Sequence, residues 1–338
     1  IKNKEETMSI AVIGAGSWGT VLSKILADNG HDVVLWARNP EKAALIEQTR
    51  INNDYLPDLT LSPSIHVTHD FQWVGTAEVL VFVVPSKGMG TVCSDLSRVT
   101  KGKGKILLTC TKGFSRETGK LMSDVLERYF PEAQAIAALS GPNLAKELAQ
   151  KQPSASVIAS KDPKAAKILQ DLFLNGYFRP YISDDILGVQ LCGALKNCYA
   201  LVTGMISGLG LGENSQAALI TRALAEMTRL GLKLGAHQET FAGLSGIGDL
   251  VATCTSPLSR NHTAGTLLAQ GKAAKDIEQG THMVIEGMST TKTVYALSHR
   301  LGVEMPIIDQ LYEVLYHHKE ITLAAHDLMS RSGKKEWN

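Results

Sequence analysis

The chain has 338 residues, a length that fits two domains, each with its own hydrophobic core. Its 34 basic and 33 acidic residues nearly cancel and form no long block of one sign, which excludes the electrostatic footprint of a nucleic-acid-binding protein. No segment approaches the roughly 20 apolar residues of a membrane span, and residues 1–7 are polar and lie outside the expected fold. We expect a cytoplasmic protein without stable membrane insertion that binds a small molecule.

The five cysteines are odd in number and contain no C-x-x-C pair. Most lie in apolar surroundings, which is typical of reduced core thiols in a cytosolic protein. We find no metal-ligand pattern, and we expect no metal.

The first strong motif covers residues 9–20, where an apolar strand ends in G-x-G-x-x-G and a helical pattern begins at once. Gly14 permits a tight turn, Gly16 lets the backbone approach a pyrophosphate, and Gly19 lets the helix pack closely on the strand. Free amides at the helix N-terminus favour an anion. A second strand follows at residues 33–36, so the unit predicts dinucleotide binding; the alternative is a tight turn that binds nothing.

Arg38 stands where an NAD-selective domain usually places an acidic residue for the ribose 2′-hydroxyl. Its guanidinium can bind a 2′-phosphate or stack on adenine. We therefore expect NADP to bind at least as well as NAD. A solvated Arg38 before the next helix is the alternative.

The remaining N-terminal half alternates strands and helices. The segment at 78–84 is apolar on both faces, as a central parallel strand must be when helices cover both sides of its sheet. The pattern predicts an α/β fold with a doubly wound sheet. Further strands are expected at 65–68, 105–111, 135–139 and 155–159.

Strand signals stop near Asp184, and helical periodicity continues to the end of the chain. We predict a dinucleotide-binding Rossmann domain at 8–183 and an all-helical substrate and catalytic domain at 184–338. Helices are expected at 187–204, 215–234, 248–254, 263–270, 289–301 and 307–317.

Two polar clusters follow predicted strands. Lys112 lies at the end of one strand, where open α/β sheets bind their ligands. The run 140–143 follows the next strand, and its backbone amides could face a nicotinamide or a substrate. A helix started by Pro142 and capped by Asn143 is an equally open alternative.

A strongly apolar helical segment, 193–200, carries one lysine, Lys196. A buried amine is suited to proton transfer, whereas the alternative is a lysine that extends to the helix edge. Asp249 and Thr253 stand four residues apart and share a helix face, so they could hold Lys196 and a substrate hydroxyl. We assign Lys196, Lys112, Asp249 and Thr253 to the catalytic group.

The run Ser259, Arg260 and Asn261 starts another helix. An arginine, an amide side chain and free backbone amides at a helix start suit a phosphate. Ser259 as an ordinary N-cap is the alternative.

With these residues together, the chain from Met8 nearly to the C-terminus resembles the bacterial NAD(P)-dependent glycerol-3-phosphate dehydrogenase family. The motifs that carry the resemblance lie at 14–19, 111–113, 140–142, 193–197, 248–250 and 259–261. The implied fold is a Rossmann-type sheet followed by an all-α domain like that at the C-terminus of 6-phosphogluconate dehydrogenase.

The resemblance also implies roles for individual residues. Contacts to the cofactor are implied for Ser17, Trp18, Arg38, Lys112, Ala145, Arg260, Val284 and Glu286. Contacts to the substrate are implied for Lys112, Gly141, Asn143, Lys196, Asn197, Asp249, Ser259, Arg260 and Asn261. Lys196 is the implied proton acceptor. Asn143 departs from the family, which often has Thr or Ser there.

The implied activity is reversible reduction of dihydroxyacetone phosphate to sn-glycerol 3-phosphate, in cytosolic dimers that supply phospholipid synthesis. A ketopantoate or β-hydroxyacid reductase of the same architecture is the alternative enzyme. A non-catalytic NADP(H) sensor is the alternative from another class, but it leaves Lys196 and the run 259–261 without a role.

Overall fold

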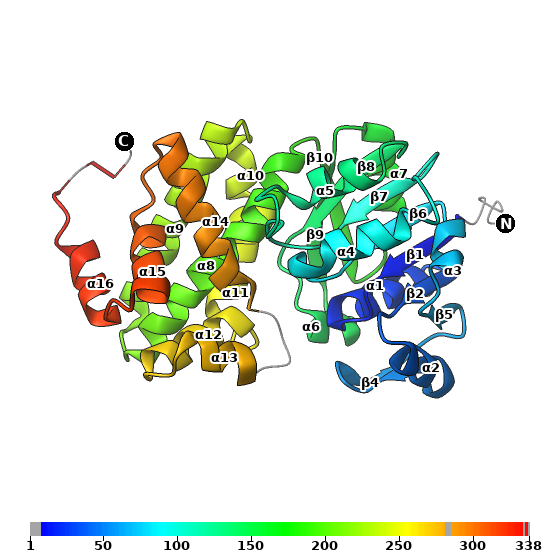
Figure 1. The fold of residues 1–338 in the computed structure, drawn as a ribbon, viewed down its shortest axis with the longest axis horizontal. Coiled ribbons are helices and arrows are strands. Elements are labelled where there is room, and N and C mark those ends of the chain that lie inside the picture. Colours follow the sequence, from blue (N-terminus) through cyan, green and yellow to red (C-terminus); the bar gives the residue numbers. More distant parts are fainter. Residues whose placement is uncertain (1–7, 281–284, 334, 337–338) are drawn as a thin grey trace. The chain divides into compact units, whose positions relative to one another are not determined.

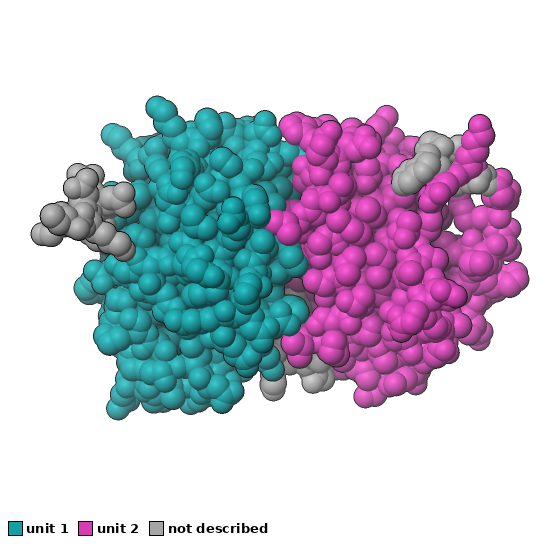
Figure 2. Space-filling view, turned by 180° about the vertical axis from the view of Figure 1, so that it is seen from behind, with its two compact units in different colours: residues 1–190 teal, residues 191–338 magenta. Residues whose placement is uncertain are grey.

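The computed structural model describes residues 8–280, 285–333 and 335–336. The chain divides into two compact units, residues 1–190 and residues 191–338 (Figure 2). The division falls inside the long helix α8 (Ile186–Gly208), a few residues beyond the predicted domain boundary at 183–184. That boundary stays a prediction.

Unit 1 is built on an eight-stranded sheet with the order β10-β9-β8-β7-β6-β1-β2-β5 (Figure 1). All neighbours pair in parallel except β8 and β9, which are antiparallel. The strands are β1 (Ile10–Ile13), β2 (Val33–Trp36), β5 (Ile65–Thr68), β6 (Val79–Phe82), β7 (Ile106–Thr109), β8 (Ala135–Ser140), β9 (Ser154–Ser160) and β10 (Phe178–Ser183).

Helices cover both faces of this sheet, because alternate residues of each central strand point into different cores. Ile10 and Val12 of β1 belong to one core, whereas Ala11 and Ile13 belong to the other. The doubly wound architecture is confirmed. The helices of unit 1 are α1 (Ser17–Asp28), α2 (Pro40–Thr49), α3 (Phe71–Thr76), α4 (Ser86–Leu96), α5 (Met122–Tyr129), α6 (Ala145–Ala149) and α7 (Pro163–Phe173).

Three strands were not predicted. The short antiparallel pair β3 (Ile51–Asn52) and β4 (Leu56–Thr60) lies outside the main sheet. The third, β10, forms an edge of the sheet and carries Pro180, which cannot donate a backbone hydrogen bond. Edge strands tolerate proline, but a proline inside a short segment removes the sequence signal for a strand.

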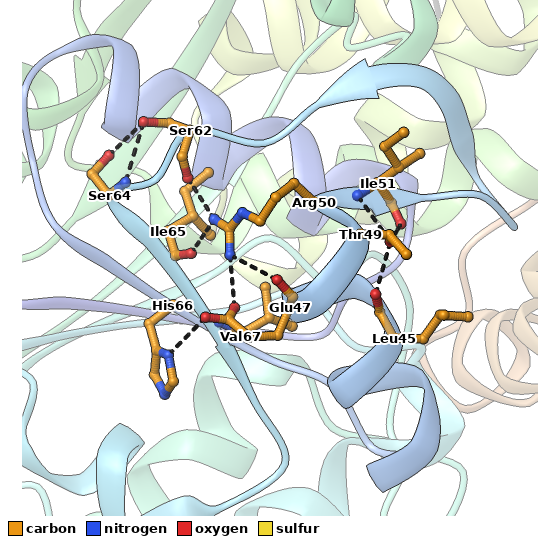
Figure 3. A network of polar contacts seen from close by, with 10 residues as sticks. All are labelled: Leu45, Glu47, Thr49, Arg50, Ile51, Ser62, Ser64, Ile65, His66 and Val67. Atoms are coloured by element: carbon orange, nitrogen blue, oxygen red, sulfur yellow. Dashed lines mark hydrogen bonds and ion pairs between the residues drawn. The ribbon is translucent and has the colours of Figure 1, made fainter.

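Arg50 joins the end of α2 to the start of β5 (Figure 3). It adopts the left-handed conformation that ends α2, with φ of 59°. Its guanidinium donates to the backbone oxygens of Ser62 and Ile65, and to Oε2 of Glu47 at 2.8 Å. The same Glu47 oxygen accepts from the amide of Val67 at 2.6 Å. The ion pair of Arg50 and Glu47 therefore provides hydrogen-bond partners for the backbone oxygens of Ser62 and Ile65 and for the backbone amide of Val67.

The described residues of unit 2 form helices joined by loops, and none of them forms a strand. The unit contains most of α8, followed by α9 (Glu213–Leu234), α10 (Gln238–Ala242), the single π-helical turn η1 (Leu244–Gly248), α11 (Asp249–Thr255), α12 (Arg260–Ala269), α13 (Ala274–Gly280), α14 (Glu286–Leu301), α15 (Pro306–His317) and α16 (Ile321–Met329).

Helix α8 is long and apolar enough to cross a membrane, but 89% of its apolar window is buried inside the fold. Such burial is typical of a core helix. Its contact with α12 depends on glycine: a Cβ on Gly204 would lie 2.0 Å from the backbone oxygen of His262, and a Cβ on Gly265 would lie 1.9 Å from that of Leu201. Gly204 and Gly265 thus allow α8 and α12 to pack closely.

A fully buried carboxyl, Glu226 on α9, ties three helices together. It accepts a hydrogen bond from the Tyr199 hydroxyl of α8 at 3.2 Å and from the Ile307 amide of α15 at 2.7 Å. Burial raises the pKa of Glu226 to about 8, against an ordinary value of 4.5. The folded state therefore binds this proton more tightly than the unfolded chain does.

We predict that the protonated Glu226 contributes stability that is complete below about pH 4.5 and is lost as the pH rises through about 8. Glu226→Gln keeps an acceptor for the Ile307 amide, can donate to the Tyr199 oxygen in place of accepting from its hydroxyl, and cannot ionise. Between about pH 5 and pH 8, the unfolding free energy of the parent protein should fall by on the order of 3 kcal/mol relative to the variant. Urea denaturation checks this, with the exposed Glu239→Gln as the control. Parallel pH profiles for parent and Glu226→Gln would contradict the assignment.

Candidate active site

The candidate residues of unit 1 follow the carboxyl ends of its parallel strands. Gly14 follows β1, Arg38 follows β2, Lys112 follows β7 and Gly141 follows β8. These strands are parallel, with β6 between β1 and β7, so their carboxyl ends meet at one edge of the sheet. That edge is where open α/β sheets bind nucleotides.

The three glycines of the first turn meet three different requirements. Gly14 has a φ of 122°, and a Cβ there would lie 2.8 Å from the backbone oxygen of Val83. A Cβ on Gly19 would lie 1.8 Å from the backbone oxygen of Gly14. A Cβ on Gly16 would meet nothing within 4 Å. Packing thus explains Gly14 and Gly19, whereas the space beside Gly16 is left for a ligand.

Gly16 is also the N-cap of α1, and no side chain caps that helix end. The first backbone amides of α1 therefore lack the acceptor that a Ser, Thr, Asp or Asn N-cap would provide. A pyrophosphate placed here would accept from those amides and gain from the helix dipole. The open side of Gly16 and the uncapped amides fit a dinucleotide.

The neighbouring expected cofactor residues differ in exposure. Arg38 is exposed, with its guanidinium accessible to an anion. The next residue, Asn39, caps α2 by accepting from the Lys42 amide at 2.9 Å. Ser17 is the first residue of α1, and Trp18 is half-buried against the edge of Phe178, with 6.3 Å between ring centroids.

The structure brings Lys112 and Gly141 together. The Lys112 ammonium donates to the backbone oxygen of Gly141 at 3.2 Å. Gly141 has a φ of 153°, and a Cβ there would lie 2.9 Å from Cα of Ser156. The alternative in which Asn143 caps a helix is wrong, since α6 begins at Ala145 with Leu144 as N-cap. The Asn143 amide instead bonds to the Ser156 hydroxyl of β9.

In unit 2, Lys196 of α8 is held by two side chains of α11. Its ammonium forms a buried ion pair with Oδ1 of Asp249 and donates to the Thr253 hydroxyl at 2.8 Å. The Lys196 side chain is 9% exposed and that of Asp249 is 2% exposed. The alternative of a lysine extending to solvent is therefore wrong, and Asp249 and Thr253 share the face that holds it, as predicted.

The approach of α11 to α8 follows the π-helical turn η1, a feature often found at functional sites. A Cβ on Gly246 of this turn would lie 2.0 Å from the backbone oxygen of Phe241, so only glycine fits there. Cys254 follows Thr253 and is fully buried, and burial raises the pKa of its thiol to about 12. The thiol is therefore protonated and inert near neutral pH.

The three residues predicted to bind a phosphate, Ser259, Arg260 and Asn261, have different environments in the structure. Ser259 is the N-cap of α12 and accepts from the His262 amide at 3.3 Å, so the capping interpretation is confirmed. Arg260 is exposed at the first position of the helix. Asn261 is buried and bonds to Asn197 of α8 and to the Gly287 amide of α14.

For the remaining residues predicted to contact the cofactor, we report only their place in the fold. Ala145 is the first residue of α6 and is half-buried, and Glu286 is the first residue of α14. Val284 lies outside the described residues. Within the described ranges, no group of three His, Cys, Asp or Glu side chains is placed to hold a metal ion.

Sequence reasoning missed two features of unit 2. The Tyr199 and Glu226 pair gave no signal, because an acidic residue on an amphipathic helix is usually exposed. The bond between Asn197 and Asn261 joins residues 64 positions apart, and local pattern cannot predict it. Both asparagines had been assigned only to substrate.

The fold and the two groups of residues define a class. A Rossmann-type unit with a phosphate-binding turn and a helical unit with a buried lysine are typical of two-domain NAD(P)-dependent dehydrogenases. Comparison with known proteins narrows this class.

Two family models match the chain. The model of the NAD-dependent glycerol-3-phosphate dehydrogenase N-terminus matches residues 9–166, and that of the C-terminus matches residues 185–326. A glycerol-3-phosphate dehydrogenase [NAD(P)+] of Lacticaseibacillus casei is 44% identical, over 97% of this chain and 96% of that protein. The protein of the same name from Syntrophotalea carbinolica is 46% identical, over 97% and 99%.

A solved structure agrees. The crystal structure of glycerol-3-phosphate dehydrogenase from Coxiella burnetii superposes with a TM-score of 0.91 at 35% identity, covering 96% of this chain and 99% of that one. The chain belongs to the NAD-dependent glycerol-3-phosphate dehydrogenase family, whose members are NAD(P)-dependent oxidoreductases.

The glycine turn yields a test that separates ligand binding from folding. Gly16→Ala places a methyl group in open space, so the unfolding free energy should change by no more than about 1 kcal/mol, while the affinity for NADPH falls at least about tenfold. Gly19→Ala, the matched control, should destabilise unit 1 because its methyl group overlaps the Gly14 oxygen. Fluorescence titration and denaturation measure the two effects. Full NADPH affinity in Gly16→Ala would argue against a pyrophosphate at this turn.

Proposed function

We propose that the chain is an NAD(P)-dependent sn-glycerol-3-phosphate dehydrogenase that reversibly reduces dihydroxyacetone phosphate to sn-glycerol 3-phosphate. The observation that carries the proposal is the buried Lys196 amine, held by Asp249 and Thr253 in a chain that matches this family over nearly its full length. A buried, fixed amine is what proton transfer to a ketone oxygen requires.

The cofactor belongs to unit 1. The amides after Gly16 would hold its pyrophosphate, and Arg38 would bind the adenosine ribose, with a 2′-phosphate as the better partner for a guanidinium. When bound, the nicotinamide supplies or accepts the hydride at substrate C2. We expect NADPH to serve at least as well as NADH. Ser17, Trp18, Ala145, Val284 and Glu286 remain assigned to the cofactor by family resemblance.

Lys196 performs the proton step in this proposal. As an ammonium it polarises the C2 carbonyl and gives a proton to the oxygen when the ketone is reduced, and in the reverse direction it takes the proton of the C2 hydroxyl. Asp249 compensates the buried charge, and Thr253 fixes the direction of the amine. Lys112 and Gly141 are proposed to contact the substrate, together with Asn143.

The substrate phosphate is assigned to the start of α12. Arg260 supplies an exposed guanidinium there, and Ser259 and Asn261 flank it. Binding energy gained at the phosphate, remote from C2, is then used to position the carbonyl against Lys196. Arg260 is also assigned to the cofactor.

The cellular setting follows from the family resemblance. We propose a cytoplasmic homodimer, without stable membrane insertion, that supplies glycerol 3-phosphate for phospholipid synthesis. The cysteines support this placement, since all five are buried and none forms a disulfide.

The activity is tested by following NADPH absorbance with dihydroxyacetone phosphate. Rapid oxidation is the expected result, and the assay is repeated with NADH to rank the cofactors. Ketopantoate, which offers a carboxylate in place of the phosphate, should give little turnover. Turnover of ketopantoate and not of dihydroxyacetone phosphate would assign the chain to the alternative reductase.

Replacing the amine tests the proton step. Lys196→Ala should lower kcat by about 100-fold or more, because general acid catalysis is lost, while NADPH still binds. The control is Lys233→Ala, which removes an exposed lysine from α9. Steady-state kinetics and NADPH fluorescence measure the two effects, and near-normal turnover in Lys196→Ala would refute the assignment.

Replacing the guanidinium tests the phosphate site. Arg260→Ala should raise KM for dihydroxyacetone phosphate by about 10- to 100-fold, the cost of losing charge-assisted hydrogen bonds. The slow reduction of unphosphorylated dihydroxyacetone should hardly change. Arg300→Ala, an exposed arginine of α14, is the control. An unchanged preference for the phosphorylated ketone would count against Arg260.

A further inference from the structure

A buried asparagine outside the main sheet contacts the glycine turn that follows β1. Asn52 of β3 is 3% exposed, and its Nδ2 donates to the backbone oxygen of Ala15 at 3.0 Å. The same nitrogen donates to the Thr20 hydroxyl oxygen of α1 at 2.9 Å. A backbone oxygen can only accept, so the nitrogen of Asn52, and not its oxygen, must face Ala15. Both protons of this NH2 group are therefore used, one on the turn and one on the helix after it.

The segment that carries Asn52 is itself held in unit 1. It directly follows Arg50, whose guanidinium donates to two backbone oxygens of the segment 62–65 (Figure 3). Leu56 of β4, the partner strand of β3, lies in the same hydrophobic core as Leu22 of α1. Asn52 thus reaches the turn from a well-packed segment 37 residues away in sequence.

The contact to Ala15 determines where the next backbone amide points. The peptide bond between Ala15 and Gly16 is planar and trans, so its C=O and N–H groups point in opposite directions. Since the oxygen is held toward Asn52, the Gly16 N–H is directed away from Asn52. Among the residues that the structure describes, this N–H has no backbone acceptor, and no side chain caps the helix that begins there.

Packing does not restrain this peptide on the glycine side. A Cβ on Gly16 would meet nothing within 4 Å. Glycine also has the widest choice of backbone angles, so the peptide plane before Gly16 can rotate with little steric resistance. The openness that admits a ligand therefore leaves the plane loose, and the hydrogen bond from Asn52 selects one orientation of it.

We propose that Asn52 is a positioning residue for the cofactor, which holds the Ala15 oxygen and so keeps the Gly16 N–H directed at a pyrophosphate oxygen of NAD(P)H. The inference rests on the proposed function, which assigns the cofactor to this turn. A pyrophosphate oxygen only accepts hydrogen bonds, so a rotated peptide that presents its own oxygen repels it. Asn52 thus acts on cofactor affinity without touching the cofactor.

Replacing the donor tests the contact. Asn52→Leu nearly keeps the shape of the side chain but cannot donate, so the Kd for NADPH, measured by fluorescence titration, should rise at least about tenfold. At saturating NADPH, kcat should fall by no more than about twofold, because Lys196 is unchanged. Asn53→Leu, the same change at the exposed neighbouring residue, is the control. Parent-like NADPH affinity in Asn52→Leu, or a loss confined to kcat, would overturn the proposal.

A fragment of the cofactor shows which part of the ligand is affected. Adenosine 2′-phosphate carries the groups assigned to Arg38 but no pyrophosphate. Its inhibition constant against NADPH should therefore change less than about twofold in Asn52→Leu. Equal losses for the fragment and for NADPH would show a general distortion of unit 1 and would overturn the positioning role.

Thr20 separates positioning from stability. Thr20→Val removes the second hydrogen bond of Asn52 but leaves its contact with Ala15. Both Thr20→Val and Asn52→Leu should lower the urea midpoint of unfolding, whereas only Asn52→Leu should weaken NADPH binding. The double variant brings two apolar side chains together, so it should regain part of the stability lost in Asn52→Leu while its NADPH affinity stays low. Recovery of affinity together with stability would show that Asn52 has a purely structural role.

Asn52→Ala, which removes the donor without adding apolar bulk, gives the same readouts if Asn52→Leu does not fold. Its NADPH affinity should also fall while that for adenosine 2′-phosphate is kept. Parent protein that binds NADPH and reduces dihydroxyacetone phosphate, while every folded Asn52 variant binds NADPH normally, would refute this inference alone. Parent protein that binds neither NADPH nor NADH would refute the proposed function as well.

Discussion

The buried ion pair of Lys196 and Asp249 is the constraint on which unit 2 depends. A lone ammonium inside a protein is very costly, so the amine can be buried only if an acceptor is built beside it. The Asp249 carboxylate is that acceptor, and the π-helical turn before α11, with glycine at position 246, allows its helix to begin where the carboxylate is needed. Thr253, one turn later, adds a second acceptor for the same amine. The same ion pair therefore both compensates the buried amine and holds α8 and α11 together.

Unit 1 meets a different requirement, which is to leave room for an anion. Its strands are buried on both faces, and their carboxyl ends carry glycine wherever backbone must approach backbone. Gly16 alone among the three glycines of the first turn has an open side, at an uncapped helix start. The backbone of this unit thus fits a pyrophosphate, and Arg38 after β2 is the residue that we propose distinguishes the cofactors.

Much of this could be predicted from local sequence. The strands at Val33–Trp36 and Ile65–Thr68 were placed correctly, because apolar runs bounded by turn residues are a local signal. Asp249 and Thr253 were paired from their four-residue spacing alone. The edge strand β10 was missed because Pro180 interrupts it, and Glu226 was missed because nothing in its own helix marks it as buried. Asn261 forms hydrogen bonds with Asn197 of α8 and with the Gly287 amide of α14. Both partners are distant in sequence, so no local pattern could predict these contacts.

The central claim is that the Lys196 amine faces the oxygen on substrate C2. A crystal structure of the protein with sn-glycerol 3-phosphate tests it most directly. The account predicts Nζ of Lys196 within about 3.2 Å of the C2 oxygen, with Asp249 and Thr253 still bonded to the amine. Substrate bound with that oxygen beyond the reach of Lys196, including through a bridging water, would contradict it.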